Sequence, residues 1–173
     1  MKTSQVIEQV HGILARERIT FTVGDDACGF HVPVPQGSAA VDIDFDTLGR
    51  GQSVVRLRAH VLEQVDVRPE NRLEILEHLN ALNQSALFGR FYLDADRTTI
   101  MLEHELLADD LDASELMNAL FTVGLVADQT DDELQRSLGT GRRRFEIPPS
   151  AYGDDMARWE RPRDDRPDPP GPG

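Results

Sequence analysis

The sequence predicts an α+β fold in which helices pack on one antiparallel sheet. Segments of alternating apolar residues outnumber segments with helical spacing. Most of the alternating segments come in pairs joined by short turns, which is typical of hairpins. The strand–helix–strand alternation of a parallel sheet is missing. The expected order is therefore helix, three or four strands, helix, two strands and helix.

The first expected element is an amphipathic helix over residues 4–17. Its apolar residues lie three or four positions apart, and Thr3 or Ser4 can cap it. From Ile19 the apolar spacing becomes two, which predicts a strand over residues 19–23. The segment GFHVPV that follows can form only an edge strand or an irregular strand, because its prolines supply no backbone donor.

Two longer alternating runs, residues 39–45 and 53–62, are expected to form a hairpin. Their connection, DTLGRGQ, contains Gly49 and Gly51. These glycines supply the positive backbone angles that a reversal needs.

A second helix is expected to open at Pro69, where the missing backbone donor of proline does no harm, and to end near Ser85. One stripe of this helix carries Leu73, Leu76, Leu79, Asn80 and Asn83. The segments GRFYLDAD and TTIMLEHEL are then expected to form a second hairpin. The apolar residues that alternate on one face of this hairpin are Phe91, Leu93, Ile100 and Leu102.

The last helix is expected to begin at a capping box made by Asp112 and Glu115. A second box, Thr130 with Glu133, either starts a new turn or lies inside one continuous helix. Glycines 139 and 141 end the helical segment.

The chain divides into a body, residues 1–141, and a tail, residues 142–173. The body has the usual size of one domain with one core. The tail is rich in proline, arginine and aspartate, so we expect it to be disordered. Its apolar anchors, which would allow a short docking element around SAYGDDMARW, are Phe145, Ile147, Tyr152, Met156 and Trp159.

The negative charge of the protein lies on its body. The net charge is −13, while the tail holds seven arginines and seven acidic residues. Residues 67–141 hold fifteen acidic residues and five arginines, a balance of −10. Such a surface repels phosphate backbones, which argues against nucleic acid and favours basic protein partners. The same acidity also serves plain solubility.

Cysteine usage and hydropathy predict a cytoplasmic protein without a membrane partner. Cys28 is the single cysteine, so an internal disulfide is impossible. The first residues, MKTSQVIEQVHGILARER, place charges among the apolar positions. This pattern differs from a signal peptide and from a membrane span.

The stretch VDIDFD places Asp42, Asp44 and Asp46 at every second position, as a calcium loop does at its start. The other requirements of an EF-hand fail, because Thr47 stands where glycine is needed and Ser53 where the bidentate glutamate is needed. In a strand, the three aspartates face solvent while the apolar residues between them face the core.

The hairpin offers these aspartates a structural role. Counting outward from the turn, Asp44 is expected opposite Arg56 and Asp42 opposite Arg58, and each such pair contributes on the order of 0.2–1 kcal/mol. Two alternatives stay open, a divalent-ion site and an acidic sheet surface that faces a ligand. Either would make the protein a small-molecule- or metal-dependent enzyme that uses the three aspartates, with His60 from the paired strand.

Other candidate sites in the sequence are incomplete. Cys28 and His31 have the spacing of half a zinc site, but no second pair completes it. EHEL at residues 103–106 lacks the second histidine of a zincin motif. No nucleophile elbow and no phosphate-cradling glycine loop is found, and the five histidines lie on different elements. The sequence therefore predicts no catalytic residue, no metal ligand and no cofactor.

The segment LNALNQSALFGRFYLDADRTTIMLEHELLADDLDASELMNALFTVGLVAD resembles the YbjN family. The resemblance lies in a helix that ends with Asn80 and Asn83, a strand from Phe91 to Leu93, a strand that carries Leu102, and a late helix ending in VAD. That family is similar to the class I type III secretion chaperones, the CesT-like peptide-binding proteins, in its order of helix, sheet, helix, hairpin and helix. The resemblance covers about residues 3–139.

The resemblance implies a secretion-chaperone-like fold and a non-enzymatic module, of chaperone or regulatory type, that binds a protein or peptide client. It also implies a homodimer that needs neither nucleotide nor metal. The positions that match the family motif are Asn80, Asn83, Phe91, Leu93 and Leu102. They also have structural explanations, because asparagines near a helix end satisfy free carbonyls and the apolar residues suit a core. The arginine-bearing tail departs from the short chaperone pattern.

Overall fold

The computed structural model describes residues 2–24, 29–33, 39–49, 51–95 and 98–143. Within them, the elements follow the predicted order and confirm the α+β class. The helices are α1 (Thr3–Arg16), α2 (Arg72–Ser85) and α3 (Ala113–Leu138). The strands are β1 (Thr22–Val23), β2 (Phe30–Pro33), β3 (Ala40–Thr47), β4 (Ser53–Leu62), β5 (Arg90–Leu93) and β6 (Ile100–Leu107).

The strands form one antiparallel sheet in the order β1-β2-β3-β4-β6-β5. The two predicted hairpins are β3–β4 and β5–β6, and β4 pairs with β6 between them. The predicted register of the first hairpin is confirmed, since Asp44 lies opposite Arg56 and Asp42 opposite Arg58. β5 is an edge strand of this sheet, which leaves one side of its backbone without a strand neighbour.

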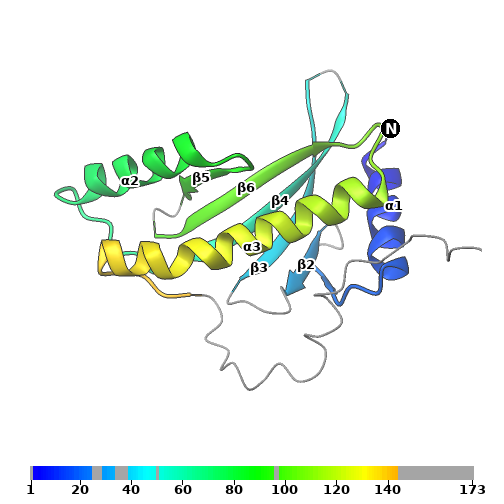
Figure 1. Cartoon of the computed structure of the whole chain (residues 1–173). Helices are drawn as coiled ribbons and strands as arrows, with labels where there is room; N and C mark the ends of the chain where they lie inside the picture. Colours follow the sequence, from blue (N-terminus) through cyan, green and yellow to red (C-terminus); the bar gives the residue numbers. More distant parts are fainter. Residues whose placement is uncertain (1, 25–28, 34–38, 50, 96–97, 144–173) are drawn as a thin grey trace, which may run out of the picture.

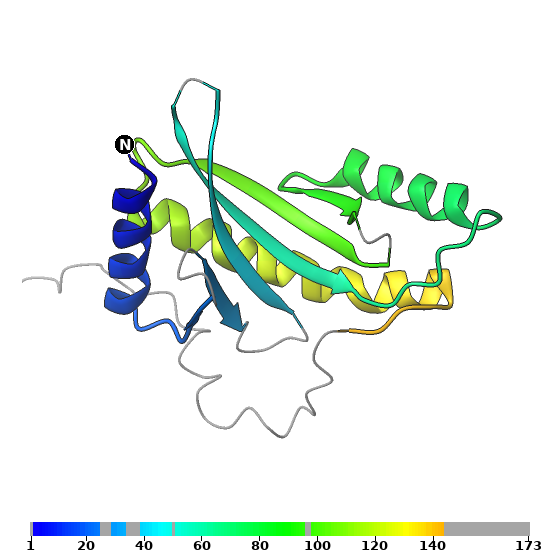
Figure 2. The same ribbon diagram turned by 180° about the vertical axis from the view of Figure 1, so that it is seen from behind.

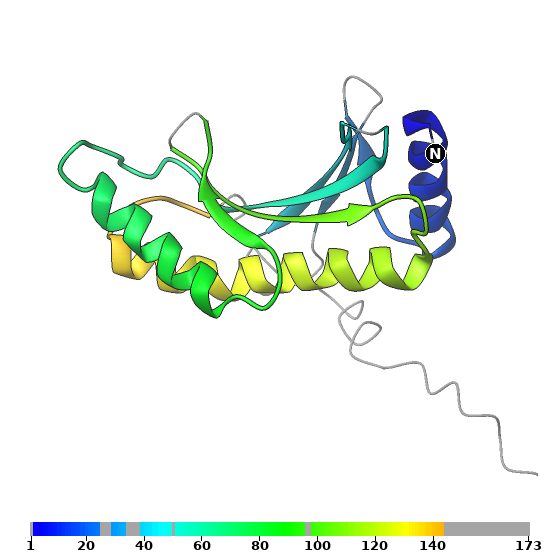
Figure 3. The same cartoon turned by 90° about the horizontal axis from the view of Figure 1, so that it is seen from above.

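The helices pack against one face of the sheet. α3 runs along β4 and β6, α2 lies beside β5, and α1 packs near β3 (Figures 1 and 3). Alternate strand residues such as Ile43, Leu57 and Leu102 point toward the helices and are fully buried there. α3 adds Leu116 and Val123 to the same core. Figure 2 shows the sheet from the opposite side, where no described helix covers β3 and β4.

α2 begins three residues later than predicted. Pro69 lies in a turn instead, because the side-chain oxygen of Asn71 accepts a hydrogen bond from the Arg68 nitrogen at 2.7 Å. The Asn71 amide nitrogen in turn donates to the Asp66 carbonyl at 2.7 Å. Such local side-chain bonds stabilise a turn in competition with the helix, and the helix starts only at Arg72.

The apolar stripe of α2 divides between the core and the surface. Ile75 and Leu79 are buried, whereas Leu73 and Leu76 are 66% and 39% exposed. The prediction placed Leu73 and Leu76 on one stripe with Leu79. The difference arises because α2 lies at the sheet edge, where a helix can bury only a narrow part of its surface.

α3 is one continuous helix. It begins at the predicted cap, where Asp112 Oδ1 accepts a hydrogen bond from the Glu115 nitrogen at 2.8 Å. Thr130 lies inside the helix, and its hydroxyl donates to the Val126 carbonyl at 2.6 Å. Gly139 ends the helix in the left-handed conformation, with a φ of 62°. In the described part of the chain, neither α3 nor another helix combines the length and apolarity that a membrane crossing needs.

The segment after α3 docks on the end of β4. Arg142 forms a bridge with Glu63, in which both backbone hydrogen bonds measure 2.8 Å. Arg143 Nη1 lies 3.1 Å from Asp132 Oδ1 on α3. The disorder predicted for the tail concerns residues that, from position 144 onward, lie outside the described part.

Candidate functional site

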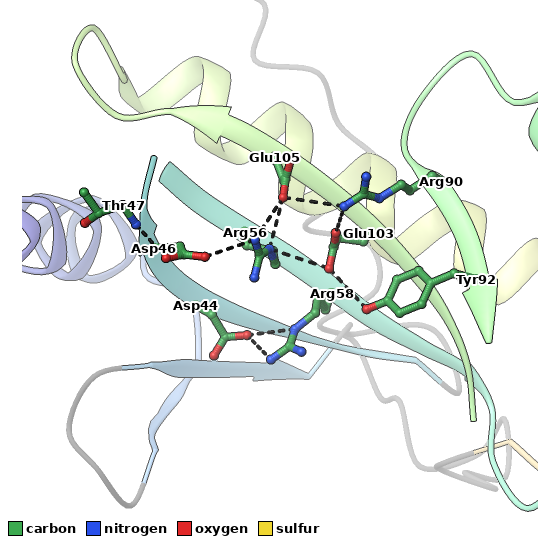
Figure 4. Close-up of polar contacts among 9 residues, drawn as sticks. All are labelled: Asp44, Asp46, Thr47, Arg56, Arg58, Arg90, Tyr92, Glu103 and Glu105. Atoms are coloured by element: carbon green, nitrogen blue, oxygen red, sulfur yellow. Dashed lines mark hydrogen bonds and ion pairs between the residues drawn. The ribbon is translucent and has the colours of Figure 1, made fainter. Parts of the chain in front are cut away.

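The aspartate side chains of β3 lie on the face of the sheet that no described helix covers. There Asp44 and Asp46 join a network of ion pairs (Figure 4). Arg58 binds Asp44 through Nη2 and through Nε, the latter at 2.9 Å. Arg56 Nη2 lies 3.3 Å from Asp46 Oδ2. Each arginine thus binds the aspartate diagonal to it rather than the one directly opposite. Long side chains reach such diagonal neighbours across a sheet.

The network continues over β6 to β5. Arg56 contacts Glu105 Oε1 at 3.1 Å, and Arg90 Nη2 lies 2.5 Å from Glu103 Oε1. The Tyr92 hydroxyl donates to Glu103 Oε2 at 3.1 Å. Burial, followed by the charge of Glu103, raises the pKa of Tyr92 to about 12, so the hydroxyl keeps its proton. These partners shield Glu103, which is only 6% exposed.

Arginines therefore pair with the acidic residues of the outer face of the sheet. Four of its carboxylates meet three guanidinium groups, and these residues are Asp44, Asp46, Glu103, Glu105, Arg56, Arg58 and Arg90. Among the described residues, no group of three or more His, Cys, Asp or Glu side chains is arranged to hold a metal ion. Asp44 and Asp46 thus occupy the ion pairs that the structural interpretation of the aspartates expects.

Asp42 has different partners. It lies opposite Arg58 as predicted, but its carboxylate contacts two histidines. His31 Nδ1 lies 2.6 Å from Oδ1, and His60 Nε2 lies 3.1 Å from Oδ2. Burial acts to raise the pKa of Asp42, but the hydrogen bonds from His60 and His31 outweigh it and hold the pKa at about 2. The convergence of His60 with Asp42 is the part of the enzyme hypothesis that the geometry reproduces.

The second ring nitrogen of His60 faces another carboxylate. His60 Nδ1 is buried and lies 3.1 Å from Glu63 Oε1, without the angles of a hydrogen bond. Cys28, which shares half-zinc spacing with His31, lies outside the described residues. The contacts of Asp42 with His31 and His60 link β3 to the strands on both sides of it, β2 and β4.

Two other histidines serve as packing groups. His11 lies edge-on to Phe21, with ring centroids 5.4 Å apart. His104 stacks on Phe88, with ring centroids 3.7 Å apart, and burial lowers the pKa of His104. His11 and His104 thus lie apart from the pair of histidines, His31 and His60, that meets at Asp42.

A groove of about 550 Å³ lies between α2 and the edge strand β5, and we call it the α2–β5 groove. Four of the five positions predicted from the family motif line it, namely Asn80, Asn83, Phe91 and Leu93. The fifth, Leu102, is fully buried in the core. The other lining residues are Arg72, Leu76, Leu79, Tyr92, Asp94 and Ala95.

Asn83 fixes the wall of the groove. Its amide nitrogen donates to the Phe91 carbonyl at 2.9 Å, and the Phe91 nitrogen donates to the Asn83 oxygen at 2.6 Å. One side chain of α2 thereby satisfies both main-chain groups of one β5 residue. Asn83 bonds to the neighbouring strand, whereas the sequence suggested the free carbonyls at the end of its own helix.

The comparison with known families bears on this arrangement. The model of the family TY-Chap1, described as "T3SS (YopN, CesT) and YbjN peptide-binding chaperone 1", matches residues 5–147. The chain belongs to this family. The resemblance to YbjN and to CesT-like proteins is thus confirmed. The chain is a peptide-binding module of chaperone type, in preference to the enzyme that the aspartate face suggested.

Solved structures share the fold of this TY-Chap1 chain. YbjN from E. coli, described as a candidate transcription regulator, aligns with a TM-score of 0.50 and 17% identity, over 73% of this chain and 92% of its own. The structure of the HopA1–SchA chaperone–effector complex aligns with a TM-score of 0.51 and 12% identity, over 77% and 98%. At these identities the likeness establishes the secretion-chaperone-like fold. Among curated proteins, none matches the chain.

The TY-Chap1 groove contains residues that the sequence analysis did not single out. Arg72 lies four residues before Leu76, so helical spacing alone could have placed it on the same stripe. Asp94 and Ala95 follow the end of β5, and only the position of the hairpin brings them to the groove.

The sequence analysis also did not single out Glu103, which belongs to the charge network and not to the groove. An acidic residue inside an apolar strand indicates buried ion partners, and this signal could have identified it.

Proposed function

We propose that the α2–β5 groove holds a segment of a protein client, and that it does so without catalysis and without a cofactor. The proposal rests on one observation above all. The half-exposed Leu76 of α2 and the free edge of β5 line the same hollow. An open apolar surface beside a strand edge is a common basis of peptide recognition.

The strand edge offers the client one main-chain partner. The Asp94 nitrogen donates to the Thr99 carbonyl across the β5–β6 hairpin at 2.8 Å. Because main-chain groups alternate along an antiparallel strand, those of Phe91 and Leu93 face away from β6. Asn83 already satisfies Phe91, so a client strand can pair with Leu93 alone. Side chains must therefore supply most of the binding free energy.

The side chains of the groove favour a client segment with a large apolar residue. Leu76 and Leu93 provide apolar surface, and full burial of one large apolar side chain contributes roughly 1.5–3 kcal/mol. Asn80, which is exposed, adds an amide that can donate and accept hydrogen bonds. Specificity then comes from the spacing between an apolar residue and a polar group of the client.

The proposal includes a homodimer. Leu125 on α3 is 54% exposed. An exposed apolar side chain on the helix that covers the sheet supports a second copy that packs against it. A homodimer would leave the α2–β5 groove of each copy to its own client.

We further propose a cytoplasmic location and a protein partner, with neither nucleic acid nor a membrane as target. The single cysteine supports a reducing compartment. The balance of −10 on residues 67–141 supports a partner without phosphate charges. Both a chaperone and a regulator would use the groove in this way.

Client capture with matched variants tests the proposed function. Wild type, Leu76→Glu and Leu48→Glu are tagged and used to capture partners from native lysate, each with and without a chelator. Leu48, which is 48% exposed in the β3–β4 connection, is the control for a surface leucine outside the groove. We expect reproducible protein partners that are unaffected by the chelator, lost with Leu76→Glu and kept with Leu48→Glu.

We expect Leu76→Glu to lower the affinity for the captured partners more than tenfold. The reason is that the substitution replaces a buried apolar contact by a charge that must be desolvated. Partners that bind Leu76→Glu as strongly as they bind wild type would show that the client-binding site lies outside the groove. Partners that the chelator removes would favour the metal-dependent alternative.

A further inference from the structure

The α2–β5 groove contains a cation without a described counter-ion. Arg72 lines the groove, and among the described residues no carboxylate lies within ion-pair distance of its guanidinium. Arg56, Arg58 and Arg90, in contrast, all contact carboxylates. Asp94 also lines the groove, but its charge acts on Tyr92. Within the described part of the chain, the groove therefore contains no carboxylate in ion-pair contact with Arg72.

A cation beside apolar side chains selects a ligand of matching chemistry. Arg72 lies one helical turn from Leu76 on the same side of α2. A guanidinium binds carboxylates in a fixed, often bidentate geometry. The preferred ligand is thus a segment in which an acidic residue stands next to a large apolar or aromatic residue.

The tail of this chain contains such a segment. The sequence YGDDMARW, residues 152–159, places two adjacent aspartates between Tyr152 and Met156 and ends at Trp159. Asp154 and Asp155 supply the carboxylates, and the aromatic and thioether side chains supply the apolar surface. Trp159 is the only tryptophan of the protein.

The point where the described chain ends brings this segment within reach of the groove. The Thr140 hydroxyl accepts a hydrogen bond from the Asp66 nitrogen at 2.9 Å, six residues before Arg72. The docked segment continues to Arg143. The nine residues from there to Tyr152 span up to about 30 Å when extended. A flexible tether of this length holds its end at an effective concentration in the range of about 1 mM.

We propose that residues 152–159 of the chain's own tail occupy the α2–β5 groove as an internal competitor of the client. This inference rests on the proposed function, because it assigns an occupant to the same groove. The carboxylates of Asp154 and Asp155 bind Arg72, and the apolar side chains of the segment cover Leu76. A client must displace the tail, so the free chain does not expose its groove to every acidic apolar segment.

Trp159 fluorescence in the full chain tests the inference, because no other tryptophan contributes. We expect Trp159 to emit at short wavelength and to resist quenching by acrylamide. Arg72→Glu and Leu76→Glu should each shift the emission to longer wavelength and increase the quenching several-fold. Glu is favourable in the first turn of a helix, so Arg72→Glu preserves α2. Leu48→Glu is the matched control and should leave both signals unchanged.

Charge reversal in the tail tests whether Asp154 and Asp155 pair with Arg72 itself or are only attracted by the overall charge of the surface. Asp154→Arg with Asp155→Arg should release Trp159, and adding Arg72→Glu to that variant should restore its protection. A Trp159 that is equally exposed in all variants would overturn the inference. Protection that survives both groove variants would do the same, since the tail would then dock elsewhere.

Two further outcomes are distinguishable. Protection that appears only as the protein concentration rises would assign the tail to a second copy and contradict the internal contact. Client capture reports on the proposed function separately. If Leu76→Glu abolishes capture while Trp159 is exposed throughout, the groove binds clients and the tail inference alone fails.

Discussion

Arg58 binds Asp44 although Asp42 stands directly opposite it, and this choice shows what single residues decide in the sheet. The hairpin register fixes which Cα atoms face each other. The side-chain torsions then select between the opposite and the diagonal partner. Because Arg58 turns to Asp44, the carboxylate of Asp42 is left to His31 and His60.

The pH dependence of stability is a test of the Asp42 contacts. The pKa of this carboxyl falls from 3.8 to about 2 in the folded protein, so its ionised form stabilises the fold above pH 3.8. This contribution is lost as the pH falls toward 2, and it amounts to about 2 kcal/mol at most. We expect Asp42→Asn to be less stable than wild type at neutral pH and to approach it between pH 4 and 2.

Urea denaturation from pH 7 to pH 2 measures this difference. The control is Asp110→Asn, which changes an exposed acidic residue of the loop after β6. A wild-type stability that falls in parallel with Asp42→Asn between pH 4 and 2 would show that the histidine contacts do not stabilise the ionised carboxylate.

At the scale of elements, α2 is attached to the sheet by a narrow contact. It buries Ile75 and Leu79, and Asn83 ties it to the backbone of Phe91. A helix that packs across the middle of a sheet would bury a broader stripe of its surface than a helix at the edge does. The narrow attachment leaves Leu76 beside the strand edge, and this creates the groove.

The clamp made by Asn83 can be tested by its removal. Asn83→Ala leaves both main-chain groups of Phe91 without their present partner, which should lower the free energy of unfolding by about 1–3 kcal/mol. Asn80→Ala removes the same type of side chain from an exposed position of α2 and should change it by less than about 0.5 kcal/mol. Chemical denaturation of both variants gives the comparison. Equal effects of the two substitutions would contradict the special role of Asn83.

The elements themselves were predicted well where periodicity is strong and poorly where local bonds decide. Both hairpins and α3 follow the expected boundaries closely, because alternating and helical spacing are long and regular there. The start of α2 was wrong by three residues, since Asn71 stabilises a turn that contains Pro69. The strand expected from Ile19 is limited to Thr22–Val23 among the described residues.

At the scale of the whole molecule, the two faces of the sheet have different tasks. The helical face builds the core and, at its edge, the α2–β5 groove. The open face carries a charge network in which each acidic partner from Asp44 to Glu105 meets an arginine. The acidic stretch that looks most like chemistry in the sequence thus forms ion pairs and histidine contacts within the sheet. The stripe of leucines and asparagines on α2, which has no catalytic signature, lines the candidate site.

The sequence could predict part of this site and not the rest. Asn80, Asn83, Phe91 and Leu93 followed from the family resemblance, and all four line the groove. Spacing cannot tell which apolar residues of α2 stay uncovered, because that depends on how the helix sits at the sheet edge. Arg72 is functional in our account only because the fold leaves it without a described counter-ion.

Site-specific photo-crosslinking in the native host tests the central claim most directly, namely that a client segment lies in the α2–β5 groove. A crosslinking amino acid replaces Leu76 in one variant, Leu48 in a second and Asp46 on the charged face in a third. Mass spectrometry then identifies the crosslinked peptides. We predict client peptides from position 76 and none from positions 48 and 46. Client peptides from position 46, with none from position 76, would contradict the account and return the function to the aspartate face.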